Sequence, residues 1–372
     1  MAMAEPFIEI DGSILEGGGQ ILRTAISLSA ILVKPVRVTN IRANRSKPGL
    51  AAQHLIGIKL VADMCGAKLR GDTIGSTEIQ FLPGKRIKHG LYVGDTRTAG
   101  SISLLMQIAL PCALLADGPI VLDLKGGTNA DMAPQIEYMT EVFKNTLKLF
   151  GATFDMKMHR RGYYPKGGGF VTIDCMPVYK FHAAKILERG YVSKIVGWSF
   201  VAGTLPMRLA TQMSDGFKDS IKDLHHRTEI TVLKEDPNIA PNNCSGIIAI
   251  CEMTSGCRLG TDGLGKRGAD PIEVGRVAGA ALRSDILTGC CLDTHLQDQV
   301  IIYMALAEGQ SSVLVGDITM HTKTAIYIAE QITKVKFEIV EDGCKNIVSC
   351  VGLGVLNRHH PLYGMEAPAP RH

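Results

Sequence analysis

The chain has 372 residues, of which 46% are hydrophobic, so it exceeds the size at which one core usually keeps growing and should contain two or more domains or repeats. Its formal net charge of +4 excludes a protein that coats nucleic acid by bulk charge, and contact with RNA or phosphate has to come from local clusters of cations. Ten cysteines without a C-x-x-C pair argue against a zinc ribbon and a disulfide framework, and they indicate an intracellular, reducing compartment.

The first 150 residues alternate short strand-like runs with amphipathic helical runs. The N-terminus shows no basic segment followed by an apolar run, so we expect no secretory signal. Residues 6–32 predict a short strand, a glycine-rich turn and a helix that carries Arg23. Further strands are expected over residues 36–43, 67–69, 78–81 and 121–124, and further helices over residues 50–64, 97–116 and 136–150.

Residues 98–116 are uncharged over a length that could span a bilayer. They contain Ser101, Ser103, Gln107 and Pro111, and ordinary globular sequence flanks them. We therefore expect a helix buried between layers and no contact with a membrane. The alternation of sheet and helix favours repeated units of a few strands and two helices.

The pattern changes at about residue 187. A block of about a hundred residues, the usual size of a small domain, predicts strands over 192–201, 229–233 and 245–252 and helices over 207–224 and 271–287. We interpret residues 187–288 as a small α/β domain inserted between repeat units. From residue 293 the earlier pattern returns, with two helices and strands over 336–340 and 346–351, and we expect the proline-rich tail over 358–372 to be disordered.

The first candidate site is the run EGGGQ at residues 16–20, followed by Arg23. Glycines let the backbone approach an anion and supply N–H donors at a helix start, and Glu16 could hold a divalent cation that bridges phosphates. A tight strand-to-helix turn with Glu16 as a cap explains the same residues. Both readings stay open on this run alone.

A second candidate is RANRSKPG at residues 42–49, where Arg42, Arg45 and Lys47 precede a helix that bears Gln53 and His54. Arginine forks match phosphate oxygens two at a time, so the cluster is typical of a phosphate clamp, although a solvated basic loop is the simpler alternative.

Residues 125–134 form an unusually polar turn before a helix. Residues 159–166, HRRGYYPK, interleave cations with aromatic rings in the manner of a surface that follows a single nucleic-acid strand, or they form an exposed hairpin tip.

Two further patterns are weak. Residues 260–267, GTDGLGKR, have the spacing of a phosphate-binding P-loop, but Arg267 stands where a Ser or Thr hydroxyl must hold magnesium, which favours a loop of the inserted block. His295 and Asp298 lie three apart on an expected helix, but no third metal ligand is near in sequence.

The stretch at residues 312–335 predicts a strand, a turn at residues 316–317 and a helix that opens near His321. The positive end of a helix dipole disfavours a protonated imidazole and attracts a phosphate, so a neutral His321 beside a bound phosphate would be a competent nucleophile. A histidine of no chemical consequence is the alternative on this stretch alone.

Taken in order, DGSILEGGGQILR, IRANRSKPGLAAQH, DTRTAGSISLLMQ, LKGGTNADMAPQ, RRGYYPKGGG, LGKRGA, LQDQ and HTKTAIYIAEQ resemble the RNA 3'-terminal phosphate cyclase family over residues 8–351. The resemblance implies an α/β (α+β) fold of three repeated units, each a four-stranded sheet with two helices, plus a smaller inserted α/β domain. The expected division is a core over residues 1–186 and 289–357, the insert over 187–288, and the tail.

The resemblance also implies site residues. His321 would be the nucleophile that attacks ATP, and Glu16 would bind Mg²⁺ (or Mn²⁺) with ATP. Gln107, Pro134, His295, Asp298 and Gln299 would contact the nucleotide, and Pro134 would pack on one face of the adenine. The cations and the amide that would bind phosphate or the RNA end are Arg23, Arg42, Arg45 and Gln53.

The implied reaction has three steps. A histidine–AMP adduct forms, the AMP moves to an RNA 3'-phosphate, and the neighbouring 2'-OH closes a 2',3'-cyclic phosphate and expels AMP. RNA with a 3'-terminal phosphate is the expected partner, with no stable protein partner. The nucleus, in the nucleoplasm, is the location that the resemblance implies, with the cytosol as the alternative.

One position departs from the family pattern. Family members generally carry Glu-Tyr before the Leu-x-Asp-Gln run, with the tyrosine stacked on adenine, whereas Thr294-His295 stands here. An imidazole offers less stacking area, so we expect ATP to bind with retained but weaker purine preference. The alternative function is that of a non-catalytic cyclase-like protein in ribosomal RNA maturation. Such relatives lack the nucleophilic histidine, so His321 favours an enzyme.

Overall fold

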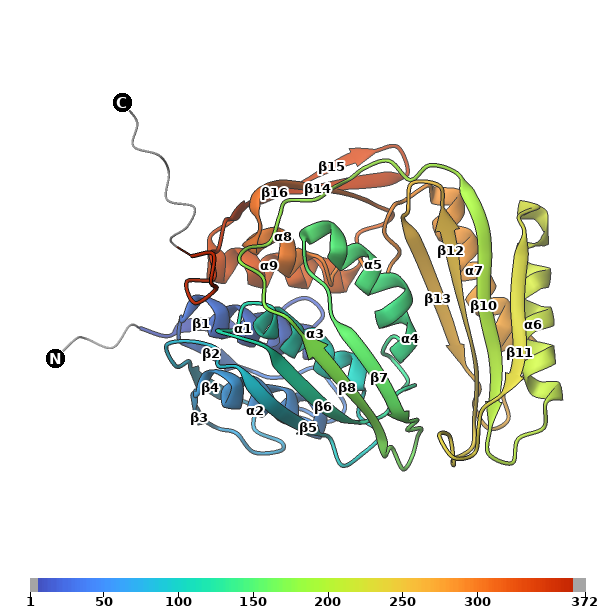
Figure 1. Ribbon diagram of the computed structural model, residues 1–372, viewed down its shortest axis with the longest axis horizontal. Coiled ribbons are helices and arrows are strands. Elements are labelled where there is room, and N and C mark those ends of the chain that lie inside the picture. Colours follow the sequence, from blue (N-terminus) through green and yellow to red (C-terminus); the bar gives the residue numbers. More distant parts are fainter. Residues whose placement is uncertain (1–5, 364–372) are drawn as a thin grey trace.

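The computed structural model describes residues 6–363 and contains three units that share one topology (Figure 1). Each unit has a first strand, a helix, a second strand parallel to the first, another helix, and two antiparallel strands. The sheet orders are β1-β2-β4-β3, β5-β6-β8-β7 and β9-β14-β16-β15, so the strands of every unit follow the same order. The expected fold of three repeated units with a further α/β part is confirmed.

The first unit consists of β1 (Ile8–Asp11), α1 (Gly19–Leu32), β2 (Val36–Thr39), α2 (Ala52–Cys65), β3 (Lys68–Arg70) and β4 (Ile79–Leu82). The second consists of β5 (Gly90–Asp95), α3 (Ile102–Ala113), β6 (Ile120–Gly126), β7 (Asp155–Arg160), β8 (Gly169–Cys175) and a continuous helical stretch. That stretch joins α4 (Ile136–Tyr138), a π-helical turn (Met139–Phe143), α5 (Lys144–Leu147) and a 3₁₀ turn (Lys148–Phe150).

The third unit consists of β9 (Lys185–Ile186), α8 (Ile301–Leu306), β14 (Glu308–Val315), α9 (Met320–Thr333), β15 (Phe337–Asp342) and β16 (Lys345–Leu353). Its first strand is interrupted. Ile186 pairs with Val313 of β14, and after the insert Leu292 forms a parallel bridge to Val315 of the same strand. The chain therefore leaves and re-enters the third sheet beside one strand.

The inserted part consists of β10 (Val192–Ala202), α6 (Arg208–Ile221), β11 (Thr228–Lys234), β12 (Cys244–Met253), β13 (Arg258–Leu264) and α7 (Pro271–Thr288). Its sheet order is β11-β10-β12-β13, which differs from that of the three units. The helix α7 begins after Asp270, whose carboxylate accepts a hydrogen bond from the Ile272 N–H, and Pro271 occupies the first turn. The exact division of the chain at residues 186, 288 and 357 stays a prediction.

The helices α1, α2, α3, α8 and α9 lie between the three sheets (Figure 1), and α1 contacts α2, α3 and α9. Their apolar side chains form one large core cluster, in which Ile26, Leu28 and Ile108 of α1 and α3 are buried. The helix α1 is apolar nearly all round because neighbouring helices and a sheet cover it.

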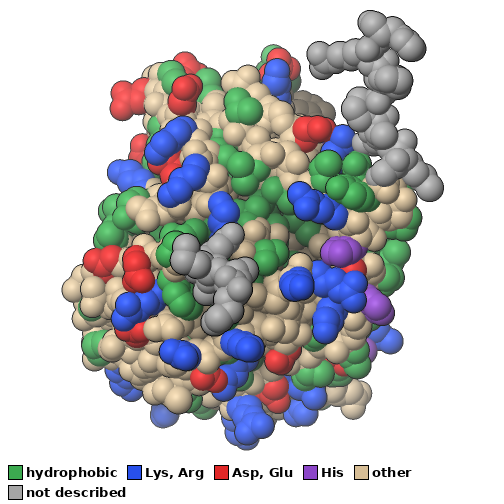
Figure 2. Space-filling model, turned by 90° about the vertical axis from the view of Figure 1, so that its left-hand side faces the viewer, with side chains coloured by type: hydrophobic (Ala, Val, Ile, Leu, Met, Phe, Trp, Pro, Cys, Tyr) green, Lys and Arg blue, Asp and Glu red, His purple; other side chains and the backbone are tan. Residues whose placement is uncertain are grey.

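The uncharged helix α3 is buried, as expected, and no helix in the part of the chain that the structure describes could cross a membrane. Figure 2 shows the face at the left of Figure 1, where Lys and Arg side chains are spread among acidic and hydrophobic ones, in keeping with the small net charge.

Several expected boundaries were wrong. The strand expected to reach residue 43 ends at Thr39, because Asn40 and Arg42 adopt positive φ in a turn. The helix expected from residue 97 begins at Ile102, where the Ser101 hydroxyl caps it by accepting from the Leu104 N–H. The strands β5, β7 and β8 were not predicted.

The glycine-rich stretch after β12 was expected to be a loop, but residues 258–264 form β13, paired with β12 throughout. The P-loop spacing at residues 260–267 therefore begins inside a strand. In the tail, residues 358–363 form hydrogen-bonded turns and His360 contacts Tyr179, while the expectation for residues 364–372 lies outside the described residues.

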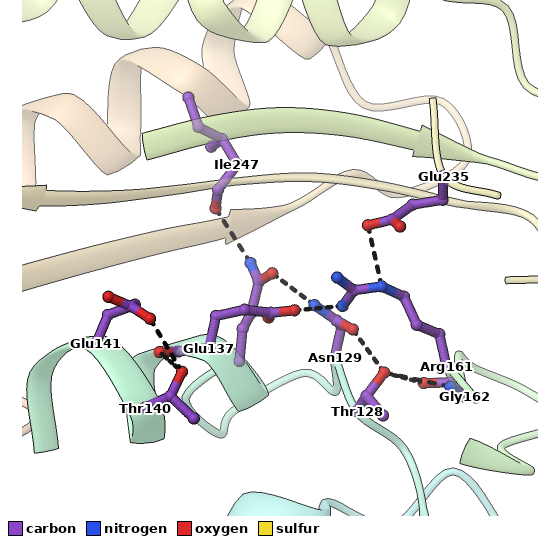
Figure 3. Close-up of polar contacts among 10 residues, drawn as sticks. Thr128, Asn129, Glu137, Thr140, Glu141, Arg161, Gly162, Glu235 and Ile247 are labelled. Carbon is purple, nitrogen blue, oxygen red and sulfur yellow. Dashed lines mark hydrogen bonds and ion pairs between the residues drawn. The ribbon is translucent and has the colours of Figure 1, made fainter. Parts of the chain in front are cut away.

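The insert meets the second unit through a buried polar junction (Figure 3). The Arg161 guanidinium lies between the carboxylates of Glu137, on α4, and Glu235, just after β11, and pairs with Glu235 at 3.0 Å. The Gln135 amide donates hydrogen bonds to the carbonyls of Ile247 at 3.1 Å and Gly263 at 3.3 Å. The Arg161 N–H donates to the Ile239 carbonyl at 2.8 Å. These contacts cross from the second unit to three separate segments of the insert.

Candidate active site

His321 is the second residue of α9, and its side chain is exposed at the start of the helix. The helix begins after Thr319, whose hydroxyl accepts a hydrogen bond from the Thr322 N–H at 3.1 Å. The expected place of His321 at a helix start is confirmed. The N–H groups of a helix's first turn lack partners within the helix, so a helix start attracts an anion.

The loop before α9 is held by Gln297, a buried residue that sequence reasoning missed. Its amide donates to the Asp317 carbonyl at 3.2 Å, and its carbonyl oxygen accepts from the Thr319 N–H at 3.2 Å and the Thr322 hydroxyl at 2.9 Å. Gln297 thereby satisfies polar groups on both sides of the turn that presents His321. Gln297 lies in the LQDQ run at residues 296–299, of which only Asp298 and Gln299 were predicted as site residues.

Asp298 lies beside the side chains of Arg23, His321 and His295. Burial raises the pKa of the Asp298 carboxyl to about 6, and these three neighbours oppose the rise. Burial lowers the pKa of the Arg23 guanidinium, an effect that Asp298 and Glu16 oppose. The expected site residues Arg23, Asp298 and His321 are therefore brought together from α1, the turn before α8, and α9.

Glu16 lies in the turn between β1 and α1. Its N–H donates to the Thr324 hydroxyl of α9 at 3.2 Å, so the turn packs against the helix that carries His321. The Glu16 carboxylate folds over Gly18, where an added Cβ would lie 2.1 Å from a carboxylate oxygen. The side chain of Arg45 pairs with one Glu16 oxygen, while the other is buried and lacks a hydrogen-bond partner among the described residues.

The unpartnered Glu16 oxygen is the observation that fits a divalent cation. A carboxylate oxygen is the ligand type that Mg²⁺ prefers, and Mg²⁺ usually takes one or two carboxylates with water and phosphate oxygens. Among the described residues no cluster of three or more His, Cys, Asp or Glu side chains could hold a metal by itself, so such an ion would depend on substrate oxygens.

The basic loop at residues 42–49 contacts the turn that holds Glu16. Arg45 donates a second hydrogen bond to the Glu16 carbonyl at 3.0 Å, and the Arg42 guanidinium donates to the Gly49 carbonyl at 2.9 Å. The loop is therefore partly ordered by its own arginines and is not simply a solvated charge run.

His54 lies between this loop and α1, and an added Cβ at Gly19 would lie 2.8 Å from both the His54 ring and the Arg23 guanidinium. Burial, together with the charges of Arg23 and Arg42, lowers the pKa of His54 to about 3. His54 is therefore neutral at physiological pH and adds no positive charge to the cluster.

Gln107 lines a small recess together with Arg23, Asp298 and Gln299. The Gln299 amide donates to the His295 carbonyl at 2.6 Å, and its own carbonyl oxygen is buried without a partner among the described residues. Four of the expected residues thus face one cavity that contains unpaired hydrogen-bonding groups.

His295 is exposed and contacts the edge of Tyr138 in a T-shaped arrangement, with ring centroids 5.9 Å apart. It belongs to a turn before α8, so the expected helix at His295 and Asp298 was wrong. Asp293 holds this turn: its carboxylate accepts from the N–H groups of His295 and Leu296 and from the Tyr138 hydroxyl at 2.6 Å.

Asp293 is fully buried and was missed by sequence reasoning, and it also accepts from the Gly260 N–H of β13 at 2.7 Å. An added Cβ at Gly260 would lie 2.7 Å from the Tyr138 ring. The insert therefore supports the turn that carries His295. Pro134 is buried just before α4.

Gln53 faces the next unit, where its carbonyl oxygen accepts from the Ser101 N–H at 3.2 Å. It therefore lies at the margin of the cluster. Of the aromatic and basic run at residues 159–166, Arg161 and Tyr163 point inward, whereas Tyr164 and Lys166 are exposed. The roles that the resemblance implies for all these residues stay predictions.

Comparison with known proteins gives one consistent result. A family model described as RNA 3'-terminal phosphate cyclase matches residues 14–339. The chain is 43% identical over 358 residues to the RNA 3'-terminal phosphate cyclase of Drosophila melanogaster, covering 95% of this chain and 99% of that protein. It is 40% identical over 347 residues to the protein of that name from Pyrobaculum neutrophilum, and the match covers 93% of this chain and 99% of that protein. It is 39% identical over 337 residues to the RNA 3'-terminal phosphate cyclase of Methanopyrus kandleri, and the match covers 89% of this chain and 95% of that protein.

Proposed function

Because the chain belongs to the RNA 3'-terminal phosphate cyclase family, we propose that it is an ATP-dependent enzyme that converts an RNA 3'-terminal phosphate into a 2',3'-cyclic phosphate through an adenylylated His321. The observation that carries the proposal is the convergence of His321, Asp298, Arg23 and Glu16 from three segments far apart in sequence. A nucleophile, cations and a carboxylate with a free oxygen are what nucleotidyl transfer requires.

In the first step an imidazole nitrogen of His321 attacks the α-phosphorus of ATP, a nitrogen–phosphorus bond forms, and pyrophosphate leaves with the electrons of the broken bond. Attack on a polyphosphate depends on charge neutralisation and in-line placement. Arg23 and the N–H groups at the start of α9 supply positive charge, and Glu16 would hold Mg²⁺ (or Mn²⁺), which neutralises phosphate charge when bound.

In the second step an oxygen of the RNA 3'-phosphate attacks the same phosphorus, and the histidine nitrogen leaves. Arg42, Arg45 and Gln53 are the residues that we propose bind the RNA end. In the last step the 2'-oxygen attacks the 3'-phosphorus, loses its proton and displaces AMP. This step is intramolecular, so a high effective molarity favours it once the phosphate is activated.

Incubation with α-labelled ATP and magnesium, without RNA, tests the first step. We expect an acid-labile protein–AMP adduct in the native protein and in His226→Ala, a control at an exposed histidine of the insert, and none in His321→Ala. RNA with a 3'-phosphate should discharge the adduct and RNA with a 3'-hydroxyl should not. Folded native protein that forms no adduct would contradict the proposal and favour a binding protein.

We further propose that the enzyme works in the nucleus, with the cytosol as the alternative, and that it needs no stable protein partner. Imaging of a tagged full-length chain and its mass in solution with and without RNA address these two points.

A further inference from the structure

The loop between β7 and β8 carries two adjacent tyrosines with opposite environments. Tyr163 is 1% exposed, whereas Tyr164 is 80% exposed. The Tyr163 carbonyl accepts a hydrogen bond from the Gly167 N–H at 2.8 Å, and Arg161 anchors the start of the loop in the buried ion pairs with Glu137 and Glu235. These buried contacts hold the base of the loop, while the Tyr164 ring is exposed to solvent.

Two cations accompany Tyr164. Lys166 lies two residues further along the loop, and Arg97 belongs to the turn between β5 and α3. The two turns touch, because an added Cβ at Gly167 would lie 2.1 Å from the Thr98 carbonyl oxygen. Arg97 and Lys166 are exposed, and neither side chain forms an ion pair with any residue that the structure describes. Their charges are thus available to a ligand.

A continuous series of contacts connects this loop to the candidate active site. Gly167 packs on Thr98, and three residues further on the Ser101 N–H donates to Gln53. Gln53 precedes His54, whose ring lies against Gly19 at the start of α1. A chain that leaves the cation cluster past Gln53 would therefore next meet the turn of Arg97 and the ring of Tyr164.

We propose that Tyr164, Arg97 and Lys166 form a subsite for the single-stranded RNA immediately 5' of the phosphorylated end. A base would stack on the Tyr164 ring, and the two cations would bind backbone phosphates. Exposed aromatic rings flanked by cations bind single strands in this way, because every base has a face that can stack. The inference rests on the proposed function, since it takes an RNA end to occupy the cluster at Arg42, Arg45 and Gln53.

Equilibrium binding without ATP tests the subsite separately from the chemistry. The probes are a 3'-phosphorylated single-stranded oligonucleotide and a nucleoside 3',5'-bisphosphate, which is too short to reach the loop. We expect Tyr164→Ala to weaken binding of the oligonucleotide by roughly 5- to 100-fold. Tyr164→Phe should retain it, and Tyr191→Ala, a control at an equally exposed tyrosine of the insert, should have no effect. The bisphosphate should bind all four proteins alike.

Photocrosslinking from a 5-iodouridine placed next to the terminal nucleotide should label the peptide that contains Tyr164. Unchanged oligonucleotide binding by Tyr164→Ala would overturn the subsite, and so would an equal loss for the bisphosphate, which would mean a general structural effect. If the native protein fails to form the AMP adduct, the proposed chemistry is refuted. The binding measurements, which use no ATP, still decide whether the subsite exists.

Discussion

Asp298 is the residue at which burial and charge oppose each other most clearly. Its carboxyl pKa is raised to about 6, above the ordinary value of 3.8, so the folded protein holds this proton after an unfolded chain has released it. The contribution to stability is therefore fully present below about pH 4 and is lost as the pH rises through about 6.

Asp298→Asn should remove this dependence. Between about pH 4 and pH 6.5 the unfolding free energy of the native protein should fall relative to that of the variant, by up to about 3 kcal/mol. Denaturant titrations of both proteins at several pH values give the difference, in which the titrating groups that do not interact with Asp298 cancel. A constant difference over this range would show that the pKa of Asp298 is not raised.

His295 gives a second prediction at the residue scale. It stands where the resemblance to the family implies a tyrosine, and its ring is exposed against the edge of Tyr138. His295→Tyr enlarges the stacking area, so ATP should bind roughly 2- to 10-fold more tightly and selectivity over pyrimidine nucleotides should rise. Nucleotide affinities measured by titration check this, and unchanged affinity and selectivity would contradict it.

Residues with unusual chemistry in short motifs were accessible from the sequence. Polar or charged residues beside glycine turns and helix starts can be recognised in a sequence. Those recognised here are Glu16, Arg23, Arg45 and His321, and the structure brings them together. Asp293 was not accessible, because its partners Tyr138 and Gly260 are distant in sequence and only folding makes it a buried hydrogen-bond acceptor.

At the scale of elements, the start of α9 depends on Gln297. Gln297→Met keeps the size of the side chain but leaves the Thr319 N–H and the Asp317 carbonyl without their partner. The free energy of unfolding should fall by about 1–3 kcal/mol. If Gln297 also positions His321, the rate of adduct formation should fall while ATP affinity changes little.

Gln310, on the exposed part of β14, offers a matched control. Gln310→Met should change neither the stability of the protein nor the adduct rate appreciably. A stable Gln297→Met protein that forms the adduct at the native rate would show that α9 holds its first turn without this amide.

The long helices were predicted well because their apolar spacing is local. The strands β5, β7 and β8 were missed for a physical reason: each has one exposed or half-exposed face and contains Gly, Asp or Lys, so propensity alone does not favour a strand. They form because β5 and β8 pair with β6 and β7 pairs with β8, which satisfies the backbone N–H and C=O groups of these strands. For β13, pairing with β12 outweighs three glycines and an aspartate in its neighbourhood.

At the scale of the whole molecule, the junction at Arg161 governs how the insert is held (Figure 3). Arg161→Met leaves the carboxylates of Glu137 and Glu235 buried without a counter-charge. Breaking a buried ion pair in this way costs about 3–5 kcal/mol. A triple variant that also carries Glu137→Gln and Glu235→Gln should recover a large part of the loss.

The single tryptophan of the chain, Trp198, provides the measurement. It lies on β10 and packs against both the main core and the cluster of Tyr163 and Phe200 at the junction. Its fluorescence should report an earlier unfolding transition in Arg161→Met than in the native protein. Coincident transitions in the native, single and triple proteins would show that the ion pairs do not hold the insert.

The interrupted first strand of the third unit has an evolutionary consequence. Ile186 and Leu292 pair with residues two positions apart on β14, so the exit and return of the insert are neighbours in space although more than a hundred positions separate them in sequence. A single genetic event, the gain or loss of one contiguous stretch, would thus convert a plain three-unit ancestor into the present architecture without rewiring any sheet. On this view the three repeated units and the insert evolved separately and were joined at one point of the third sheet.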